Sequence, residues 1–194
     1  MEREAEVKRR TKETRIEVGW RLDGDGTYRI STGIPFFNHM LELFARHGFF
    51  DLTIEAKGDI DIDYHHTIED TGITLGKALR EALPGFEHIR RFGHALVPMD
   101  ESLCMVAIDA SGRPGLVWNG DVTGRLGTFD GEVVKEFFQG FANEARITLH
   151  VNLLYGENLH HKIEAIFKAF GRALREAVTK DDKVKGVLST KGQL

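Results

Sequence analysis

The chain has 194 residues, of which 41% are hydrophobic and 29% are charged, as in an ordinary globular protein. The formal net charge of −4 provides no general attraction for nucleic acid, so a small anionic ligand would need a local cluster of basic side chains. Cys104, the single cysteine, excludes an internal disulfide, and we expect it to be a buried packing residue. Without a signal-like or membrane-spanning apolar stretch, the sequence predicts a cytoplasmic protein with no membrane partner.

The first half of the chain is expected to contain strands, a helix, a strand and a second helix. The signals are alternating apolar residues for strands, Pro35 at a helix start and Gly48 at its stop. The expected elements are a strand over 16–22, a turn at 23–26, a strand near 27–32, a helix from Pro35 to about His47, a strand at 51–56 and a helix from about His65 to Leu83.

The second half gives the same kinds of element in a similar order. The expected elements are strands near 103–109 and 116–119 with a turn at 111–115 between them, a helix over 133–144, a strand over 147–154 and a helix over 160–178. Both halves therefore predict an α+β fold in which helices cover a sheet.

The chain reads as a tandem duplication. Residues 65–83 and 160–178 align at an offset of 95, with ten of nineteen positions identical. A weaker upstream match at an offset of 97 places His39 opposite Glu136. We expect two half-domains, residues 1–90 and 91–194, that form one compact unit.

The repeated segment begins with the motif His-His-x-x-Glu, which indicates a metal site. Residues four apart share a helix face, so the pairs His65/Glu69 and His160/Glu164 each point one way. The second histidine of each motif points well round the helix and can hardly serve the same ion, which favours two metal positions.

A lone histidine near an apolar face is more often a structural residue than a ligand. Two copies of the motif at equivalent places are much harder to explain in that way. Imidazole and carboxylate ligands suit Mn, Fe, Ni, Co or Zn, so the pattern leaves the metal open. Glu136 alone would be read as a solvated charge, and its relation to His39 makes both residues candidate ligands.

Five segments, TGIPFFNHML, DYHHTIEDTGI, RFGHALVPMDESL, DASGRP and NLHHKIEAIFKAFGRAL, resemble the signatures of the imidazoleglycerol-phosphate dehydratase family. The similarity runs from about Thr11 to Lys191. It implies a lyase of histidine biosynthesis that removes water from imidazole glycerol phosphate to give imidazole acetol phosphate. It also implies two ferredoxin-like halves, two Mn²⁺ ions per site, and an octahedral homo-oligomer of trimers with shared sites.

The resemblance assigns roles to individual residues. It implies one ion held by His39, His66, His160 and Glu164, and another held by His65, Glu69, Glu136 and His161. It implies that Glu13 is the acid/base, that His47 and Lys168 contact substrate, and that Arg91, Arg113, Ser189 and Lys191 bind phosphate. Without the resemblance, Glu13 and the arginines would be read as ordinary surface residues, and the serine and lysine as part of a polar tail.

Two positions depart from the family pattern. Many members have His where this chain has Glu136, which bears on the second ion's ligand set. Many also have Asp where this chain has Asn38, which we expect to alter the support of His39 more than ligation itself.

Two other functions are compatible with a histidine-rich metal site. A dinuclear metallohydrolase would use a bridging hydroxide, although such sites usually rely on aspartates and bridging carboxylates. A non-catalytic protein could use the ions only to hold its subunits together. Such a protein would not require the candidate anion ligands Arg91, Arg113, Lys168 and Lys191. The sequence contains no GxSxG, Walker or HExxH motif that would favour a serine hydrolase, a P-loop protein or a zincin.

Overall fold

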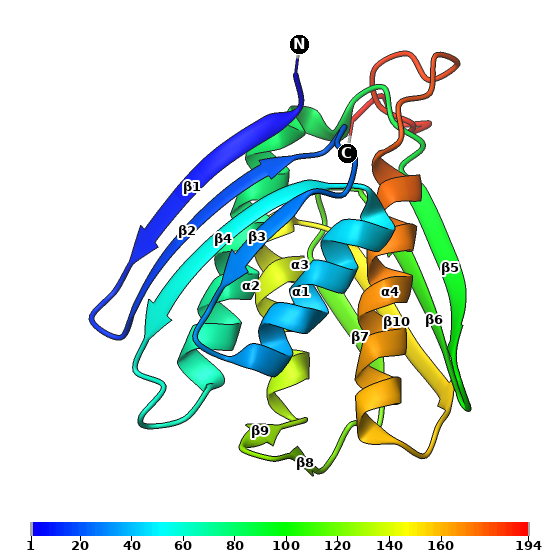
Figure 1. The fold of residues 1–194 in the computed structure, drawn as a ribbon. Coiled ribbons are helices and arrows are strands. Elements are labelled where there is room, and N and C mark those ends of the chain that lie inside the picture. Colours follow the sequence, from blue (N-terminus) through cyan, green and yellow to red (C-terminus); the bar gives the residue numbers. More distant parts are fainter. Residues whose placement is uncertain (1, 194) are drawn as a thin grey trace.

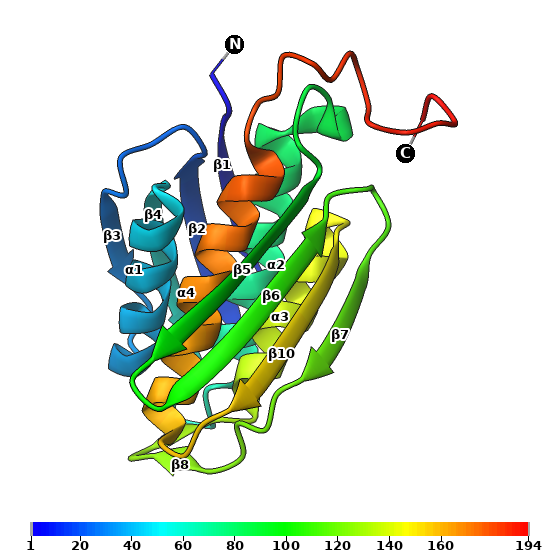
Figure 2. The same ribbon diagram turned by 90° about the vertical axis from the view of Figure 1, so that its right-hand side faces the viewer.

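The computed structural model describes residues 2–193, and within this range two four-stranded sheets enclose a layer of four α-helices (Figure 1). Viewed from the side, the helices lie between the sheets and the C-terminal tail runs along one end of the molecule (Figure 2). None of the helices in this described range is long and apolar enough to cross a bilayer.

The two halves have the same topology. The first comprises β1 (Glu4–Arg10), β2 (Thr14–Arg21), β3 (Tyr28–Ser31), α1 (Pro35–Gly48), β4 (Asp51–Gly58) and α2 (His65–Ala82). The second comprises β5 (Phe92–Met99), β6 (Ser102–Asp109), β7 (Gly115–Asn119), α3 (Val133–Ala145), β10 (Thr148–Tyr155) and α4 (Leu159–Val178). Their sheets have the orders β1-β2-β4-β3 and β5-β6-β10-β7. A short 3₁₀ turn, Pro84–Phe86, follows α2, and a small hairpin of β8 (Arg125–Leu126) and β9 (Phe129–Asp130) precedes α3.

The expected α+β duplication with helix-covered sheets is confirmed, and the expected helices lie within a few residues of their observed bounds. The sequence missed the edge strands β1 and β5. Val7 is the one fully buried residue of β1. β5 buries small residues such as Gly93, whose added Cβ would lie 2.1 Å from the carbonyl oxygen of Ala173. Small buried residues give a weak alternation signal.

The turns after β2 and β6 do not close hairpins. In each half the next strand crosses to the far edge of the sheet, where β3 pairs in parallel with β4 and β7 pairs in parallel with β10. The intervening helix provides the crossover that such parallel pairing requires.

The four helices pair across the duplication. α2 of the first half packs on α3 of the second, and α4 of the second packs on α1 of the first. Both contacts use a glycine, because a Cβ on Gly76 would lie 2.5 Å from the carbonyl oxygen of Phe141 and one on Gly171 would lie 2.6 Å from that of Phe44. Backbones can approach this closely only where a side chain is absent. The His-His-x-x-Glu helix of each half is therefore held against the first helix of the other half.

The Asp-Gly-Asp-Gly turn after β2 is fixed by Asp51 at the start of β4. Its Oδ1 accepts from the backbone N–H groups of Asp25 and Thr27, at 2.9 and 3.0 Å, and Oδ2 accepts from the Arg21 guanidinium. Partial burial opposes ionisation, but these hydrogen bonds outweigh it and lower the pKa of Asp51 to about 2.

We expect Asp51→Asn to destabilise the protein at pH 7 by about 1–2 kcal/mol, after allowing for solvent exposure of the ion pair. Because the pKa is lower in the folded state, this stabilisation is present above the unfolded value near 4 and lost as the pH falls towards 2. Denaturant unfolding from pH 7 to pH 2 should show the two proteins converge at low pH. The exposed Asp182→Asn is the control, and a constant gap between wild type and Asp51→Asn would contradict the assignment.

We expect Gly76→Ala and Gly171→Ala each to cost about 2–3 kcal/mol, because the new methyl group meets a backbone oxygen that cannot move without separating two helices. Gly19→Ala is the matched control, since its Cβ would meet only Thr53 at 3.8 Å. Thermal unfolding of the three variants measures the effect. Equal stability of all three would show that the helix crossings do not depend on these glycines.

Candidate metal centre

Two helices from different halves bring three potential ligands to one point. His160 and Glu164 lie one turn apart on α4, with Nε2 and Oε2 3.1 Å apart. His39 reaches the same carboxylate from α1, with its Nε2 3.6 Å from Oε2 of Glu164. The ligand atoms of the three residues all lie within 4.8 Å of one another. Two imidazoles and a carboxylate converging in this way are a donor set that suits a divalent transition metal.

Glu164 is a buried carboxylate held in its charged form. Only 6% of the residue is exposed, and burial by itself would raise its pKa. The ammonium group of Lys168, 2.6 Å from Oε1, together with His39 and His160, lowers the pKa by more than burial raises it. A buried anion of this kind is suited to hold a cation.

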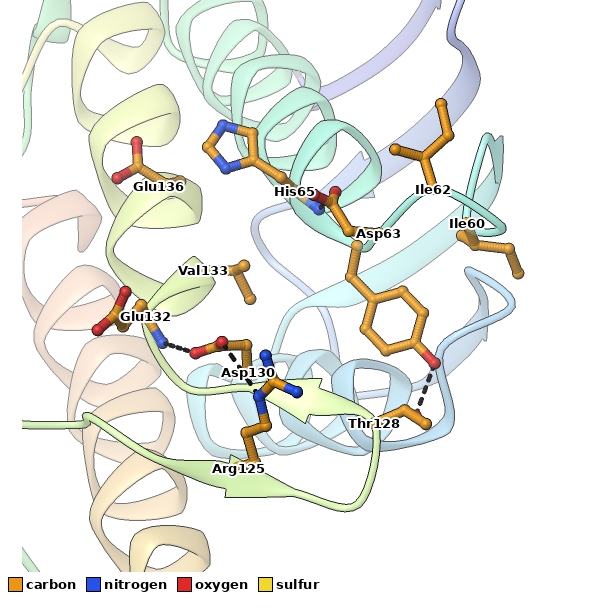
Figure 3. Close-up of a pocket in the computed structure, with 11 residues that line it drawn as sticks. Ile60, Ile62, Asp63, His65, Arg125, Thr128, Asp130, Glu132, Val133 and Glu136 are labelled. Carbon is orange, nitrogen blue, oxygen red and sulfur yellow. Dashed lines mark hydrogen bonds and ion pairs between the residues drawn. The ribbon is translucent and has the colours of Figure 1, made fainter.

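A second group of potential ligands lies between α2 and α3. His65 and Glu69 are one turn apart on α2, with Nε2 and Oε2 3.7 Å apart. Glu136 projects from α3 and lines, together with His65, a cavity of about 650 Å³ (Figure 3). The helix crossing through Gly76 places these residues on facing helices, in the same way as His39 and His160. The relation between His39 and Glu136 that the repeat indicated is therefore reproduced in space.

The second histidine of each motif turns away from the first. The ring centroids of His65 and His66 are 6.0 Å apart, and those of His160 and His161 are 6.1 Å apart, with nearly perpendicular planes. Nδ1 of His66 lies 3.0 Å from Oδ2 of Asp59, and Nδ1 of His161 lies 2.7 Å from Oε2 of Glu101. Among the described residues, His39, His160 and Glu164 of the first expected set lie together, and His66 lies elsewhere. In the second set His65 and Glu69 are neighbours on α2, Glu136 lines a cavity with His65, and His161 lies elsewhere.

Glu13 occupies the tip of the β1–β2 turn. The hydroxyl of Thr11 accepts from the backbone N–H groups of Glu13 and Thr14, at 3.1 and 2.9 Å, and shapes the turn. The carboxylate is half exposed, with Oε1 4.0 Å from Nε2 of His66. It is therefore placed beside a candidate ligand and open to solvent.

Asn38 supports the start of α1 next to His39. Its Oδ1 accepts from the backbone N–H and the hydroxyl of Thr32, at 2.9 and 2.6 Å. A carboxylate oxygen could accept the same two hydrogen bonds, so the asparagine does not alter how this turn is built.

The four expected phosphate ligands lie together at one end of the second sheet, opposite the end that carries the β5–β6 turn. Arg91, Arg113, Ser189 and Lys191 all line one cavity of about 880 Å³. Asp109, at the end of β6, holds both guanidinium groups: Arg91 Nε lies 2.7 Å from its Oδ1, and Arg113 Nη2 lies 3.3 Å from its Oδ2. Arg91 also donates to the carbonyl oxygen of Leu188 at 2.5 Å, which ties the tail to this cavity. The cavity is lined by more cations than the one carboxylate neutralises, as anion binding requires.

His47 lies near Lys168, one helix turn along α4 from the buried Glu164. Burial is the largest influence on His47 and lowers its pKa, and the charges of Lys168 and Arg172 lower it further. A lowered pKa favours the neutral ring, which can donate one hydrogen bond and accept another. His47 also lines a shallow cavity with Arg90, Arg172 and Arg175.

Sequence reasoning missed three carboxylates that organise these residues: Asp59, Glu101 and Asp109. Asp59 opens the acidic run before α2, Glu101 lies in the β5–β6 turn, and Asp109 begins the DASGRP segment. Glu101 and Asp109 lie within segments quoted for the family resemblance, and Asp59 lies just before another, but nothing in local spacing shows which side chain each of them binds. Cys104 is buried, and burial raises the pKa of its thiol to about 12, which confirms its role in packing.

Known proteins share both the fold and the sequence. A dehydratase structure from Staphylococcus aureus aligns with a TM-score of 0.83 at 42% identity, covering 92% of this chain and 99% of its own. One from Pyrococcus furiosus aligns with a TM-score of 0.85 at 41% identity, covering 97% and 100%. The fold and the paired histidine helices thus define a dehydratase, a hydro-lyase built from two fused halves.

The sequence comparisons identify the family. Its profile, described as imidazoleglycerol-phosphate dehydratase, matches residues 32–174. Proteins of that name from Trichlorobacter lovleyi and Bacillus cereus are each 56% identical to this chain; the first alignment covers all of both chains, and the second covers 99% of this chain and all of the relative. The chain belongs to the imidazoleglycerol-phosphate dehydratase family.

Proposed function

We propose that the protein removes water from D-erythro-imidazole glycerol phosphate to give imidazole acetol phosphate, a step of histidine biosynthesis. The observation that carries the proposal is the convergence of His39, His160 and Glu164 across α1 and α4. The other copy of the motif adds the His65–Glu69 pair on α2, with Glu136 facing His65 across a cavity from α3. They occur in a chain whose family carries that activity in its name. We also propose a cytoplasmic location, as the composition indicates.

The metal site is proposed to hold two Mn²⁺ ions and to be completed between copies of the chain. His39, His160 and Glu164 would hold one ion with a partner's residue equivalent to His66. His65, Glu69 and Glu136 would hold the other with a partner's residue equivalent to His161. The contacts of the two outlying histidines support this arrangement, because each has its Nδ1 within hydrogen-bond distance of a carboxylate. Nε2 lies farther from its nearest carboxylate, 4.0 Å from Glu13 for His66 and 3.7 Å from the exposed Asp100 for His161.

A closed homo-oligomer follows from this sharing of ligands, and we propose the octahedral assembly of trimers implied by the family resemblance. Within each chain, residues 1–90 and 91–194 are proposed as the two half-domains. Ligands from both halves occur in each candidate group, so neither half would hold an ion with three ligands by itself.

The reaction removes a proton from carbon and a hydroxyl group from the neighbouring carbon, which leave together as water, and the resulting enol tautomerises to the ketone. The hydrogen lies on a carbon with no adjacent carbonyl, whereas the hydroxyl group leaves from the carbon that bears the imidazole. The ring of the substrate can therefore supply electrons as the hydroxyl leaves and accept the electron pair of the C–H bond afterwards. Bound cations would stabilise negative charge on that ring. Glu13 is proposed to transfer the proton, since its carboxylate is exposed and lies beside His66.

The remaining residues are proposed to position the substrate. Arg91 and Arg113, oriented by Asp109, would bind the phosphate together with Ser189 and Lys191. Because this cavity lies at the opposite end of the second sheet from His160, it is proposed to serve a substrate whose imidazole is bound at the metal site of a neighbouring copy. His47 and Lys168 would contact the substrate near the first candidate group, where Lys168 already reaches Glu164. A basic cavity of this kind favours an enzyme for a phosphorylated small molecule over a protein whose ions only staple subunits.

We expect metal-stripped protein to lack dehydratase activity and Mn²⁺ to restore it. Turnover is followed as formation of imidazole acetol phosphate, with Ca²⁺, which prefers oxygen ligands, as the control metal. Release of inorganic phosphate in place of the ketone would favour the metallohydrolase. If Mn²⁺ binds tightly and restores the oligomer, but neither dehydration nor phosphate release is detected, the result would favour a non-catalytic protein whose ions hold its subunits together.

We expect Arg113→Met to raise KM for the substrate by about 10–100-fold with a much smaller change in kcat, because a charged hydrogen bond to phosphate is lost. Inhibition by inorganic phosphate should weaken in parallel. Arg15→Met, on the outer face of the first sheet, is the matched control and should leave both constants unchanged. An unchanged KM in Arg113→Met would place the phosphate elsewhere.

A further inference from the structure

The strand register shows that the β1–β2 and β5–β6 turns are equivalent. Arg10 pairs with Arg15 in the first hairpin, and Pro98 pairs with Leu103 in the second, each across four residues. The offset of 88 superimposes Glu13 on Glu101. The same offset places the buried Thr14 on the buried Ser102, and the buried Val18 on the buried Val106. This equivalence is established by the strand register, because Glu13/Glu101 and Val18/Val106 are the only identical pairs between the two hairpins at this offset.

Both turn glutamates face the second histidine of the motif in their own half. Oε1 of Glu13 lies 4.0 Å from Nε2 of His66, whereas Oε2 of Glu101 lies 2.7 Å from Nδ1 of His161. The duplication thus placed one carboxylate beside each outlying histidine, but on different ring nitrogens.

Glu101 is fixed and Glu13 is free. Oε1 of Glu101 accepts from the backbone N–H groups of Glu157 and Asn158, at 3.2 and 2.8 Å, and from the hydroxyl of Ser102 at 3.1 Å. Asn158 is the N-cap of α4 and accepts from the backbone N–H of His161. Glu101 therefore links the β5–β6 turn, the start of α4 and the ring of His161.

In the first half the ring is held by a different residue. Oδ2 of Asp59 lies 3.0 Å from Nδ1 of His66, and its buried Oδ1 has no hydrogen-bond partner among residues 2–193. Because Asp59 already contacts Nδ1, Glu13 is not needed to orient His66. The carboxylate of Glu13 forms no hydrogen bond with residues 2–193.

We propose that Glu101 is a positioning residue for His161. A carboxylate only accepts hydrogen bonds, so its contact fixes the proton of His161 on Nδ1 and leaves the lone pair of Nε2 for an ion. The two turn glutamates thus have different roles: Glu101 orients His161, whereas Glu13 remains available to transfer a proton. The inference rests on the proposed function in taking His161 as a metal ligand.

The test is Glu101→Gln in the full-length assembly. The amide oxygen is drawn to the N–H groups of Glu157 and Asn158, which turns the amide NH₂ towards Nδ1 of His161. The amide NH₂ and an N–H at Nδ1 of His161 would both be donors and cannot form a hydrogen bond with each other. The ring proton of His161 therefore moves to Nε2, which can then no longer bind the ion. We expect Mn²⁺ affinity at one of the two positions to fall about 10–100-fold, as measured by electron paramagnetic resonance titration of metal-stripped protein.

Asp59→Asn is the matched comparison for the other histidine. Because its Oδ1 has no partner in the described residues, the amide can keep its oxygen on His66, and we expect a smaller loss of Mn²⁺ affinity than in Glu101→Gln. Ser102→Ala removes a contact to Glu101 but leaves the contact to His161, and should bind Mn²⁺ like wild type.

A purely structural role for Glu101 predicts a different result. It would lower the melting temperature of the metal-stripped protein without changing Mn²⁺ affinity, whereas the positioning role raises the Mn²⁺ concentration needed for half-maximal turnover and lets excess Mn²⁺ recover most of kcat. Unchanged Mn²⁺ affinity at both positions in Glu101→Gln would overturn the inference.

If Glu101→Gln does not assemble, Glu101→Asp gives the second test. Its shorter carboxylate can accept from the α4 backbone but withdraws from His161, so the same loss is expected, and wild-type affinity would overturn the inference. Mn²⁺ binding is measured without substrate. Wild-type protein that binds two ions but does not dehydrate the substrate would therefore contradict the proposed function and leave the role of Glu101 standing.

Discussion

The close approach of helices from opposite halves is the constraint on which the rest of the structure depends. Gly76 on α2 and Gly171 on α4 leave no side chain between these helices and the backbones of α3 and α1. Each His-His-x-x-Glu helix therefore lies against a helix that brings one more candidate ligand, His39 in one case and Glu136 in the other. Each candidate group combines residues of both halves, so a half-domain folding by itself would bury a helix face but would not bring a third candidate ligand to its His/Glu pair.

Carboxylates hold five of the other candidate functional side chains, namely His66, His161, Arg91, Arg113 and Lys168. Asp59 and Glu101 hold the outlying histidines, Asp109 holds two arginines, and Glu164 is itself held ionised by Lys168. In each case a fixed acceptor removes conformational freedom that a ligand would otherwise have to restrict on binding, which is the physical basis of preorganisation. The net negative charge of the chain is thus compatible with a strongly basic cavity at one end.

The two halves have kept their topology and diverged in their chemistry. The candidate group across α1 and α4 contains two imidazoles and one carboxylate, whereas the candidate residues across α2 and α3 are one imidazole and two carboxylates, so the two groups differ in charge. The equivalent turns show the same divergence, with one glutamate immobilised and the other exposed. Such asymmetry lets a symmetric scaffold assign different tasks to its two halves.

The sequence by itself determined the duplication, the bounds of the main helices and the pairing of His65 with Glu69 and of His160 with Glu164, because helical spacing is a local property. It also indicated that His39 and Glu136 are equivalent. Only the tertiary structure decided which helices face each other, that β3 and β7 cross to pair in parallel, and that Glu101 is the counterpart of Glu13. These relations join residues far apart in the chain, and they depend on where a missing Cβ lets two backbones meet and on the register of paired strands, neither of which leaves a periodic signal.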